Sequence, residues 1–249
     1  GCFILKKKVK ILSVAVILGL LAVYCFRAGE FLREHLAEGR DTVGRLTAAS
    51  EERNENLIVL DPGHGGIDGG KIGVNGAEEK EINLKISLKI KEILENAGMT
   101  VVMTREDDQR LAESQVEDLK KRASLMNEQN AVLTVSIHQN SYHEAGVSGA
   151  QVFYYTDSAE GKLAAQILQE ALKELDPENT KEAKGNNTYY ILKQTEVPVV
   201  IVECGFLSNY SDAEKLADDS YQQELAKAIA KGISEYIRCG MTPASTGGE

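Results

Sequence analysis

From Leu57 onward, short apolar runs alternate with longer segments of helical periodicity, and this alternation limits the fold more than any other feature of the chain. The first run, Leu57 to Leu60, ends in Asp61-Pro62-Gly63, which predicts a buried strand entering a turn. Further strands are predicted at 100–104, 131–137, 151–155, 189–192 and 197–202, and helices at 81–96, 115–129, 161–175, 212–216 and 221–237. Alternating strands and helices predict one α/β domain whose sheet is covered by helices on both faces.

The N-terminal end has a different composition. Residues 1–27 carry five basic residues and no acid, and the uncharged run Ile11–Phe26 follows the lysines at 6–10. A basic flank before an apolar run is typical of an export signal, although the run is shorter than the ~20 residues of a spanning helix. We expect a signal anchor rather than a cleaved signal peptide, which places the rest of the protein outside the cytoplasmic membrane. Residues 28–56 are predicted to be a charged spacer, 57–238 the folded domain and 239–249 a polar tail.

Charge and cysteine content exclude two classes of protein. The chain has 38 acidic against 28 basic residues and a net charge of −10, whereas a nucleic-acid-binding protein needs a basic surface. The four cysteines, two of which precede residue 27, do not suggest a disulfide framework, and we interpret all of them as free thiols.

Four polar side chains stand where strands or helices meet loops: His64, Glu79, His138 and Glu203. Each has a plain structural alternative, because a histidine after a strand can simply be a satisfied core residue and a Glu in a first helical turn favours the helix dipole. Glu203 is harder to explain in this way, since it follows a wholly apolar strand where a carboxylate is costly unless paired or bound to metal. Cys204 should face the opposite side of the strand and is interpreted as a core residue.

Two histidines and one glutamate form a catalytic zinc set in which water takes the fourth position. His64, Glu79 and His138 are therefore candidate ligands of one zinc ion, and Glu203 is the candidate general base. The glycine-rich stretch around His64 does not match the dinucleotide pattern, because its sixth position is Asp68 and not Gly.

Five stretches, in order, give the chain a specific resemblance. From Leu57 to about Ile237 it resembles the zinc-dependent N-acetylmuramoyl-L-alanine amidases of the Amidase_3 family. The matching stretches are LDPGHGG at 60–66, EKEINL at 79–84, TR at 104–105 followed by DD at 107–108, SIHQNS at 136–141 and VECGFLSN at 202–209. The resemblance implies a single α/β domain with a mixed sheet of about six strands. It also implies that His64, Glu79 and His138 bind the zinc and that Glu203 is the catalytic glutamate.

The implied reaction is hydrolysis of the amide between N-acetylmuramic acid and L-alanine in peptidoglycan. Arg105, Asn140 and Asp68 are candidates for supporting the ligands or contacting substrate. Arg105 could orient the Asp107–Asp108 turn or contact a substrate carboxylate, and an arginine that simply caps its own loop is an equal alternative. Within the family, the stretches 148–155 and 190–193 most resemble the sporulation amidases of CwlD type, which remove stem peptides from spore cortex so that muramic-δ-lactam can form. A sporulation amidase would lie between forespore and mother cell, and a peptidoglycan deacetylase would act in the same pathway.

The 64 residues between His138 and Glu203 are used up by predicted strands, one helix and a linker, so we expect no built-in plug and regulation through expression or a separate activating protein. Three alternatives stay open at this point: a vegetative autolysin with the same chemistry, a zinc peptidase that cuts within the stem peptide, and a non-catalytic wall-binding protein on the same fold.

Overall fold

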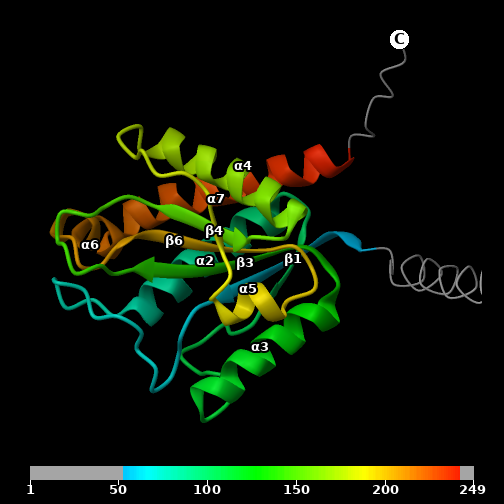
Figure 1. Ribbon diagram of the computed structural model, residues 1–249, viewed down its shortest axis with the longest axis horizontal. Helices are drawn as coiled ribbons and strands as arrows, with labels where there is room; N and C mark the ends of the chain where they lie inside the picture. Colours follow the sequence, from blue (N-terminus) through cyan, green and yellow to red (C-terminus); the bar gives the residue numbers. More distant parts are fainter. Residues whose placement is uncertain (1–52, 242–249) are drawn as a thin grey trace, which may run out of the picture. The chain divides into compact units, whose positions relative to one another are not determined.

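The computed structural model describes residues 53–241, and the predictions for the signal segment, most of the spacer and the polar tail lie outside them. A six-stranded sheet runs through the domain in the order β2-β1-β3-β6-β4-β5 (Figure 1). The strands are β1 (Asn54–Pro62), β2 (Thr100–Met103), β3 (Ala131–Asn140), β4 (Gln151–Tyr155), β5 (Lys184–Asn186) and β6 (Val199–Phe206). The first four in the spatial order are parallel, and β4 pairs with β6 antiparallel, so the predicted mixed sheet is confirmed.

Helices cover both faces of this sheet. They are α2 (Glu79–Asn96), α3 (Gln115–Gln129), α4 (Ala159–Leu175), α5 (Tyr190–Gln194), α6 (Tyr210–Ala217) and α7 (Asp219–Met241). Alternate residues of β1 explain the two layers: Ile58 and Leu60 join the core under α2, α4 and α7, whereas Leu57 and Val59 join a second core under α3 and α5. No helix in the described part of the chain is both long and apolar enough to span a membrane.

The prediction of a strand at Tyr189–Leu192 is wrong, because this segment forms the short helix α5. Asn186 Oδ1 accepts the backbone N–H groups of Thr188 and Tyr189, at 2.7 and 2.9 Å, and this turn bends the chain just before the helix. Ile191 and Leu192 are both buried in the core under α3, which successive residues of a strand could not achieve. The strand β5, which the sequence did not indicate, lies just before this turn.

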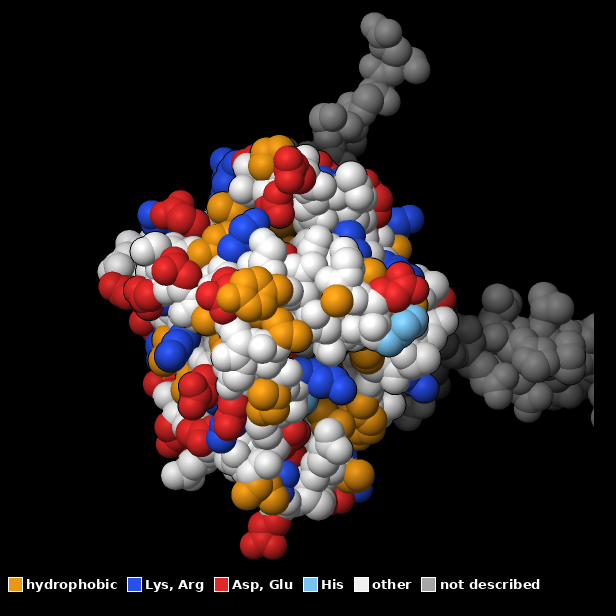
Figure 2. Space-filling view, turned by 90° about the vertical axis from the view of Figure 1, so that its left-hand side faces the viewer, with side chains coloured by type: hydrophobic (Ala, Val, Ile, Leu, Met, Phe, Trp, Pro, Cys, Tyr) orange, Lys and Arg blue, Asp and Glu red, His pale blue; other side chains and the backbone are white. Residues whose placement is uncertain are grey.

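The parallel strands β1, β3 and β6 are adjacent and end at the same edge of the sheet. Figure 2 views the molecule from this side and shows acidic side chains toward the left margin, with hydrophobic and uncharged groups near the centre. Carboxyl ends of neighbouring parallel strands are where α/β folds collect their reacting groups.

Candidate metal and catalytic site

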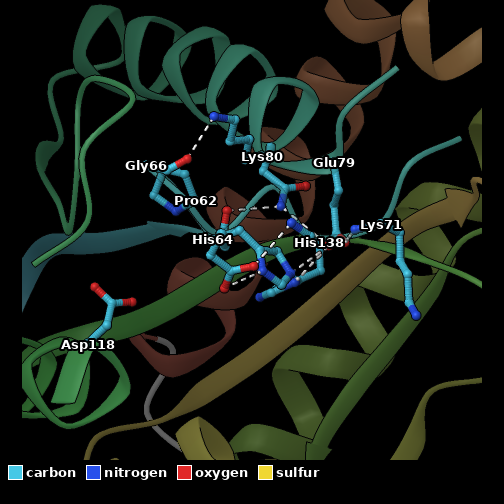
Figure 3. Close-up of polar contacts among 12 residues, drawn as sticks. Pro62, His64, Gly66, Lys71, Glu79, Lys80, Asp118 and His138 are labelled. Atoms are coloured by element: carbon cyan, nitrogen blue, oxygen red, sulfur yellow. Dashed lines mark hydrogen bonds and ion pairs between the residues drawn. The ribbon is translucent and has the colours of Figure 1, made fainter. Parts of the chain in front are cut away.

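Three side chains from distant parts of the sequence converge at this edge. His64 lies in the loop after β1, Glu79 is the first residue of α2, and His138 lies in β3, inside the strand that was predicted to end before it. One ligand atom from each lies within 4.8 Å of the other two. Glu79 Oε1 is 3.2 Å from His64 Nε2 and 3.0 Å from His138 Nδ1, and the imidazole rings meet edge to face (Figure 3).

The charges of these groups support one another. Burial by itself would raise the pKa of Glu79, but the hydrogen bonds and charges of His138 and His64 outweigh burial and hold that pKa well below its usual range. Burial would lower the pKa of His64, but Glu79 and Asp68 outweigh it and raise the pKa of His64 to about 9. In the absence of a bound cation, the carboxylate thus pulls a proton toward the place that a metal would take.

The Glu79 carboxylate is held in position from behind. Its Oε2 accepts the backbone N–H of Lys71 at 2.8 Å, and its Oε1 accepts that of Gln139 at 3.1 Å. The side chain is almost fully buried, and it therefore has little freedom to leave the point where the two imidazoles meet.

Glu203 stands beside the three converging residues. It pairs in register with His138 across β3 and β6, so both side chains point to the same face of the sheet. Burial raises the pKa of Glu203 to about 7, with a further increase from Glu79 and opposing effects of His138 and His64. Its Oε2 is buried and makes no hydrogen bond to any described residue, and such an atom is costly without a partner.

Two glycines make room for these side chains. A Cβ on Gly63 would lie 2.2 Å from His138 Cε1, and a Cβ on Gly70 would lie 2.6 Å from Glu79 Oε2. Gly70 also has φ +68°, which glycine adopts without strain. The glycine-rich loop thus brings its backbone against the candidate ligands, and a phosphate-binding role is not needed to explain its glycines.

The three supporting candidates have different surroundings. Asp68 Oδ2 is 3.0 Å from His64 Nδ1, on the far side of the ring from Glu79. Arg105 is buried and donates to four backbone carbonyl groups, those of Pro62, Gly63, Lys80 and Asp107, so it supports the His64 loop and caps its own loop at Asp107. Asn140, at the end of β3 and two residues after His138, accepts the backbone N–H of Ser141 with its side-chain oxygen at 2.8 Å, and its part in the site stays a prediction.

Cys204 agrees with its interpretation as a core residue. It is buried in the core under α2, α4 and α7, on the opposite face of β6 from Glu203. Burial raises the pKa of its thiol well above the usual range, which is the reverse of what a thiolate nucleophile needs.

The sequence did not single out Arg122, Tyr189 or the amide pair Asn83–Gln139. Arg122 donates to the His64 carbonyl group, and Asn83 and Gln139 bond to each other behind Glu79. Tyr189 is half-buried, and burial together with the charges of Glu203 and Glu79 raises the pKa of its phenol. Two usable signals were present: Asn83 and Gln139 lie inside the matching stretches 79–84 and 136–141, and at helical spacing Arg122 shares a face with the apolar Leu119, Ala123 and Met126 of the predicted helix.

The site is open to ligands from one side. His64 and His138 keep 21% and 23% of their side chains exposed, so the described residues leave part of each imidazole uncovered. A small pocket of about 50 Å³ adjoins both imidazoles and is walled by Leu119 of α3 and Ile191 of α5. A separate, larger and more open groove is lined by Gly66, Ile67 and the residues at the start of α3.

Comparison with known proteins agrees with this geometry. The family described as N-acetylmuramoyl-L-alanine amidase matches residues 58–235. The germination-specific N-acetylmuramoyl-L-alanine amidase of Bacillus subtilis (strain 168) is 38% identical over 189 residues, which cover 73% of this chain and 79% of the relative.

Two solved amidase structures have the same fold as this chain. The CwlD amidase from Clostridioides difficile, solved in complex with the GerS lipoprotein, is 39% identical with a TM-score of 0.71, covering 74% of this chain and 99% of that one. The amidase AmiC2 of Nostoc punctiforme is 31% identical with a TM-score of 0.67, covering 75% of this chain and 99% of that one.

Proposed function

The chain belongs to the N-acetylmuramoyl-L-alanine amidase family and is an amidase that acts on peptidoglycan, and from this premise we propose that it works with one zinc ion held by His64, Glu79 and His138 and with Glu203 as general base. The amide that it hydrolyses joins N-acetylmuramic acid to the L-alanine of the stem peptide.

The described residues fit a zinc ion. Two imidazole nitrogens and one carboxylate oxygen lie within 4.8 Å of one another, and this donor set is a common one at catalytic zinc sites. The exposed edges of both imidazoles leave one side of the set free for water and substrate. Zinc, when bound there, would polarise the scissile carbonyl group and make water a better nucleophile near neutral pH.

The residues of the chain account for the proton transfers. Glu203, as the carboxylate, accepts the proton of the attacking water and then delivers it to the departing L-alanine nitrogen. A pKa raised to about 7 suits a group that must both take and return a proton. Asp68, close to His64 Nδ1, favours the tautomer that leaves Nε2 free for the metal.

One observation carries the proposal: a nearly buried carboxylate with an unpartnered oxygen stands next to an open set of two histidines and a glutamate. A buried carboxylate oxygen without a hydrogen bond is costly, and this cost favours a functional role for Glu203. This arrangement also favours an enzyme over a non-catalytic wall-binding protein.

The products of digestion test this function. Purified peptidoglycan treated with the protein should release intact stem peptides whose L-alanine amine is newly free, as identified by mass spectrometry. Glu203→Gln should release none while keeping its zinc, because the amide cannot accept the proton. Cleavage between stem-peptide residues would instead identify a peptidase, and unchanged release by Glu203→Gln would remove Glu203 from the mechanism.

We further propose that the substrate is spore cortex. Support comes from the relative named as germination-specific and from the CwlD neighbour, both nearly 40% identical over most of the domain. In this role the protein is exported, held at the membrane by residues 1–27, and prepares muramic acid for a deacetylase before the lactam closes. The neighbour solved with a lipoprotein supports a separate protein partner for this chain as well.

Cortex from a deletion strain tests the role in spores. Loss of muramic-δ-lactam, restored by the wild-type gene but not by Glu203→Gln, is the expected result. Normal lactam content together with impaired wall turnover during growth would favour the vegetative autolysin.

A further inference from the structure

The loop that carries His64 is held by an unusual number of donors. Three successive carbonyl groups, those of Pro62, Gly63 and His64, accept five N–H groups from two buried arginines and one asparagine, and all five donor–acceptor distances are between 2.6 and 3.1 Å. Most backbone carbonyl groups in loops are satisfied by water or by one partner. Here the side chains determine the path of the loop.

The backbone of His64 requires such support. Its φ is +64°, in the left-handed region, which costs a residue with a Cβ roughly 1–2 kcal/mol. The conformation turns the imidazole toward Glu79, and it persists only where the surroundings over-determine it. Arg122 Nη2 donates a hydrogen bond of 2.6 Å to the His64 carbonyl oxygen and so holds this peptide group in place.

Arg122 is itself fixed at every nitrogen. Nε donates to Asp118 Oδ2 at 2.7 Å, and Nη1 donates to Asp61 Oδ1 at 2.7 Å and to the Pro62 carbonyl oxygen at 2.8 Å. Asp61 accepts in turn from Thr104 and Ser136, which ties the guanidinium group to β1, to β3 and to the residue that follows β2. The side chain is almost fully buried, so its position is determined by the sheet and by α3.

A planar fork is necessary for this arrangement. Arg122 serves Asp118, Asp61 and the His64 carbonyl group from three different nitrogens at once, which a lysine ammonium on a flexible stem cannot reproduce. Arg122→Lys would nevertheless keep the positive charge between the two buried aspartates. The substitution therefore removes the hydrogen bond to the His64 carbonyl group without leaving the aspartates unpaired.

We propose that Arg122, assisted by Arg105, is a positioning residue that holds the Pro62–His64 loop in its left-handed turn and thereby sets the direction in which His64 presents Nε2 to the metal. The inference rests on the proposed zinc site. It adds that Arg122 affects zinc binding indirectly, by holding the backbone carbonyl groups of the His64 loop, and does not bind the metal itself.

The test is Arg122→Lys in the purified protein, with zinc affinity measured by competition with a chromophoric chelator. We expect the affinity to fall 10- to 100-fold, the range typical of residues that orient metal ligands. The visible spectrum of the cobalt(II)-substituted protein should change as well, because it reports ligand geometry. Circular dichroism and the melting temperature establish that the variant is folded.

The matched control is Gln169→Met. Gln169 is a buried polar residue that bonds to the backbone at Ala150 and Val152, on the other face of the sheet. This variant should have a lower melting temperature but the same zinc affinity and cobalt spectrum as the wild type, because a loss of stability far from the site does not change the geometry of the metal ligands.

Each remaining outcome has one meaning. Unchanged zinc affinity and cobalt spectrum in folded Arg122→Lys would overturn the proposal while leaving the zinc site intact. A wild-type protein that binds no zinc would overturn the proposed function instead. If Arg122→Lys does not fold, Arg105→Lys, which loses the contacts to Pro62 and Gly63, takes its place with the same expected loss of affinity. If neither variant folds, a positioning role separable from folding is wrong.

Discussion

Gly63→Ala tests the close approach of the glycine loop to a candidate ligand. The backbone of Gly63 is not in the left-handed region, so alanine introduces only its methyl group. That methyl would lie 2.2 Å from His138 Cε1, whereas ordinary contact begins at 3.4 Å. The loop cannot easily yield, because the Gly63 carbonyl group is held by Arg105 and Asn83.

The imidazole of His138 must therefore retreat by about 1.2 Å. Misplacement of a catalytic group by ~1 Å costs roughly 100-fold in rate, or about 2.7 kcal/mol of transition-state stabilisation. We expect kcat/KM for release of stem peptides to fall by about this factor and zinc affinity to fall with it. Both are measured on protein whose circular dichroism matches that of the wild type.

Gly146→Ala is the control, because a Cβ there would have no atom within 4 Å and the backbone is not left-handed. It should keep wild-type kcat/KM and zinc affinity. If Gly63→Ala also keeps both within about threefold, a difference of less than 1 kcal/mol, the proposed position of His138 is wrong.

Three further predictions concern single side chains. Asp68→Asn removes the charge beside His64 Nδ1 from a partly exposed position, so zinc affinity should drop 10- to 100-fold while the melting temperature stays close to that of the wild type, and an unchanged affinity would contradict the role of Asp68. Cys204→Ala should keep its turnover, and in the folded wild-type protein a thiol reagent should modify the exposed Cys239 but not the buried Cys204. Loss of turnover by Cys204→Ala without loss of zinc would show that Cys204 is a catalytic group. In metal-free protein, burial raises the pKa of Glu203 to about 7, so the folded state binds the carboxyl proton more tightly than the unfolded chain does. The protonated carboxyl group therefore stabilises the fold at low pH, and this stabilisation is lost as the pH rises through 7. Metal-free Glu203→Gln should therefore be more stable than the wild type by up to about 3 kcal/mol at pH 8, with the difference closing toward pH 4 in urea unfolding, and a difference independent of pH would be evidence against the buried carboxyl group.

The alternation of strands and helices was enough to predict the sheet and its two helical layers, because hydrophobic periodicity directly reflects which faces are buried. It failed at Tyr189–Leu192, where a turn at Asn186 and packing against α3 make a helix from residues that favour strands. Local propensity does not contain that tertiary contact.

Convergence of His64, His138 and Glu203 was predictable, since parallel neighbouring strands end at one edge of a sheet. For Arg105 the sequence left two roles open, contact with a substrate carboxylate and capping of its own loop, and its hydrogen bonds to backbone carbonyl groups, including that of Asp107, favour the second. Arg122 was within reach of sequence reasoning, since an arginine on an apolar helix face must have a buried partner.

The central claim is that one zinc ion at His64, Glu79 and His138 serves hydrolysis by Glu203. The most direct measurement strips the purified protein with chelator, adds zinc in steps and records both bound metal and released stem peptide. We predict that wild-type activity rises to a plateau at one zinc per chain, that Glu203→Gln binds the same single zinc and releases nothing, and that Glu79→Gln binds zinc weakly. Full activity in the stripped protein, or turnover by Glu203→Gln at its zinc plateau, would contradict the account.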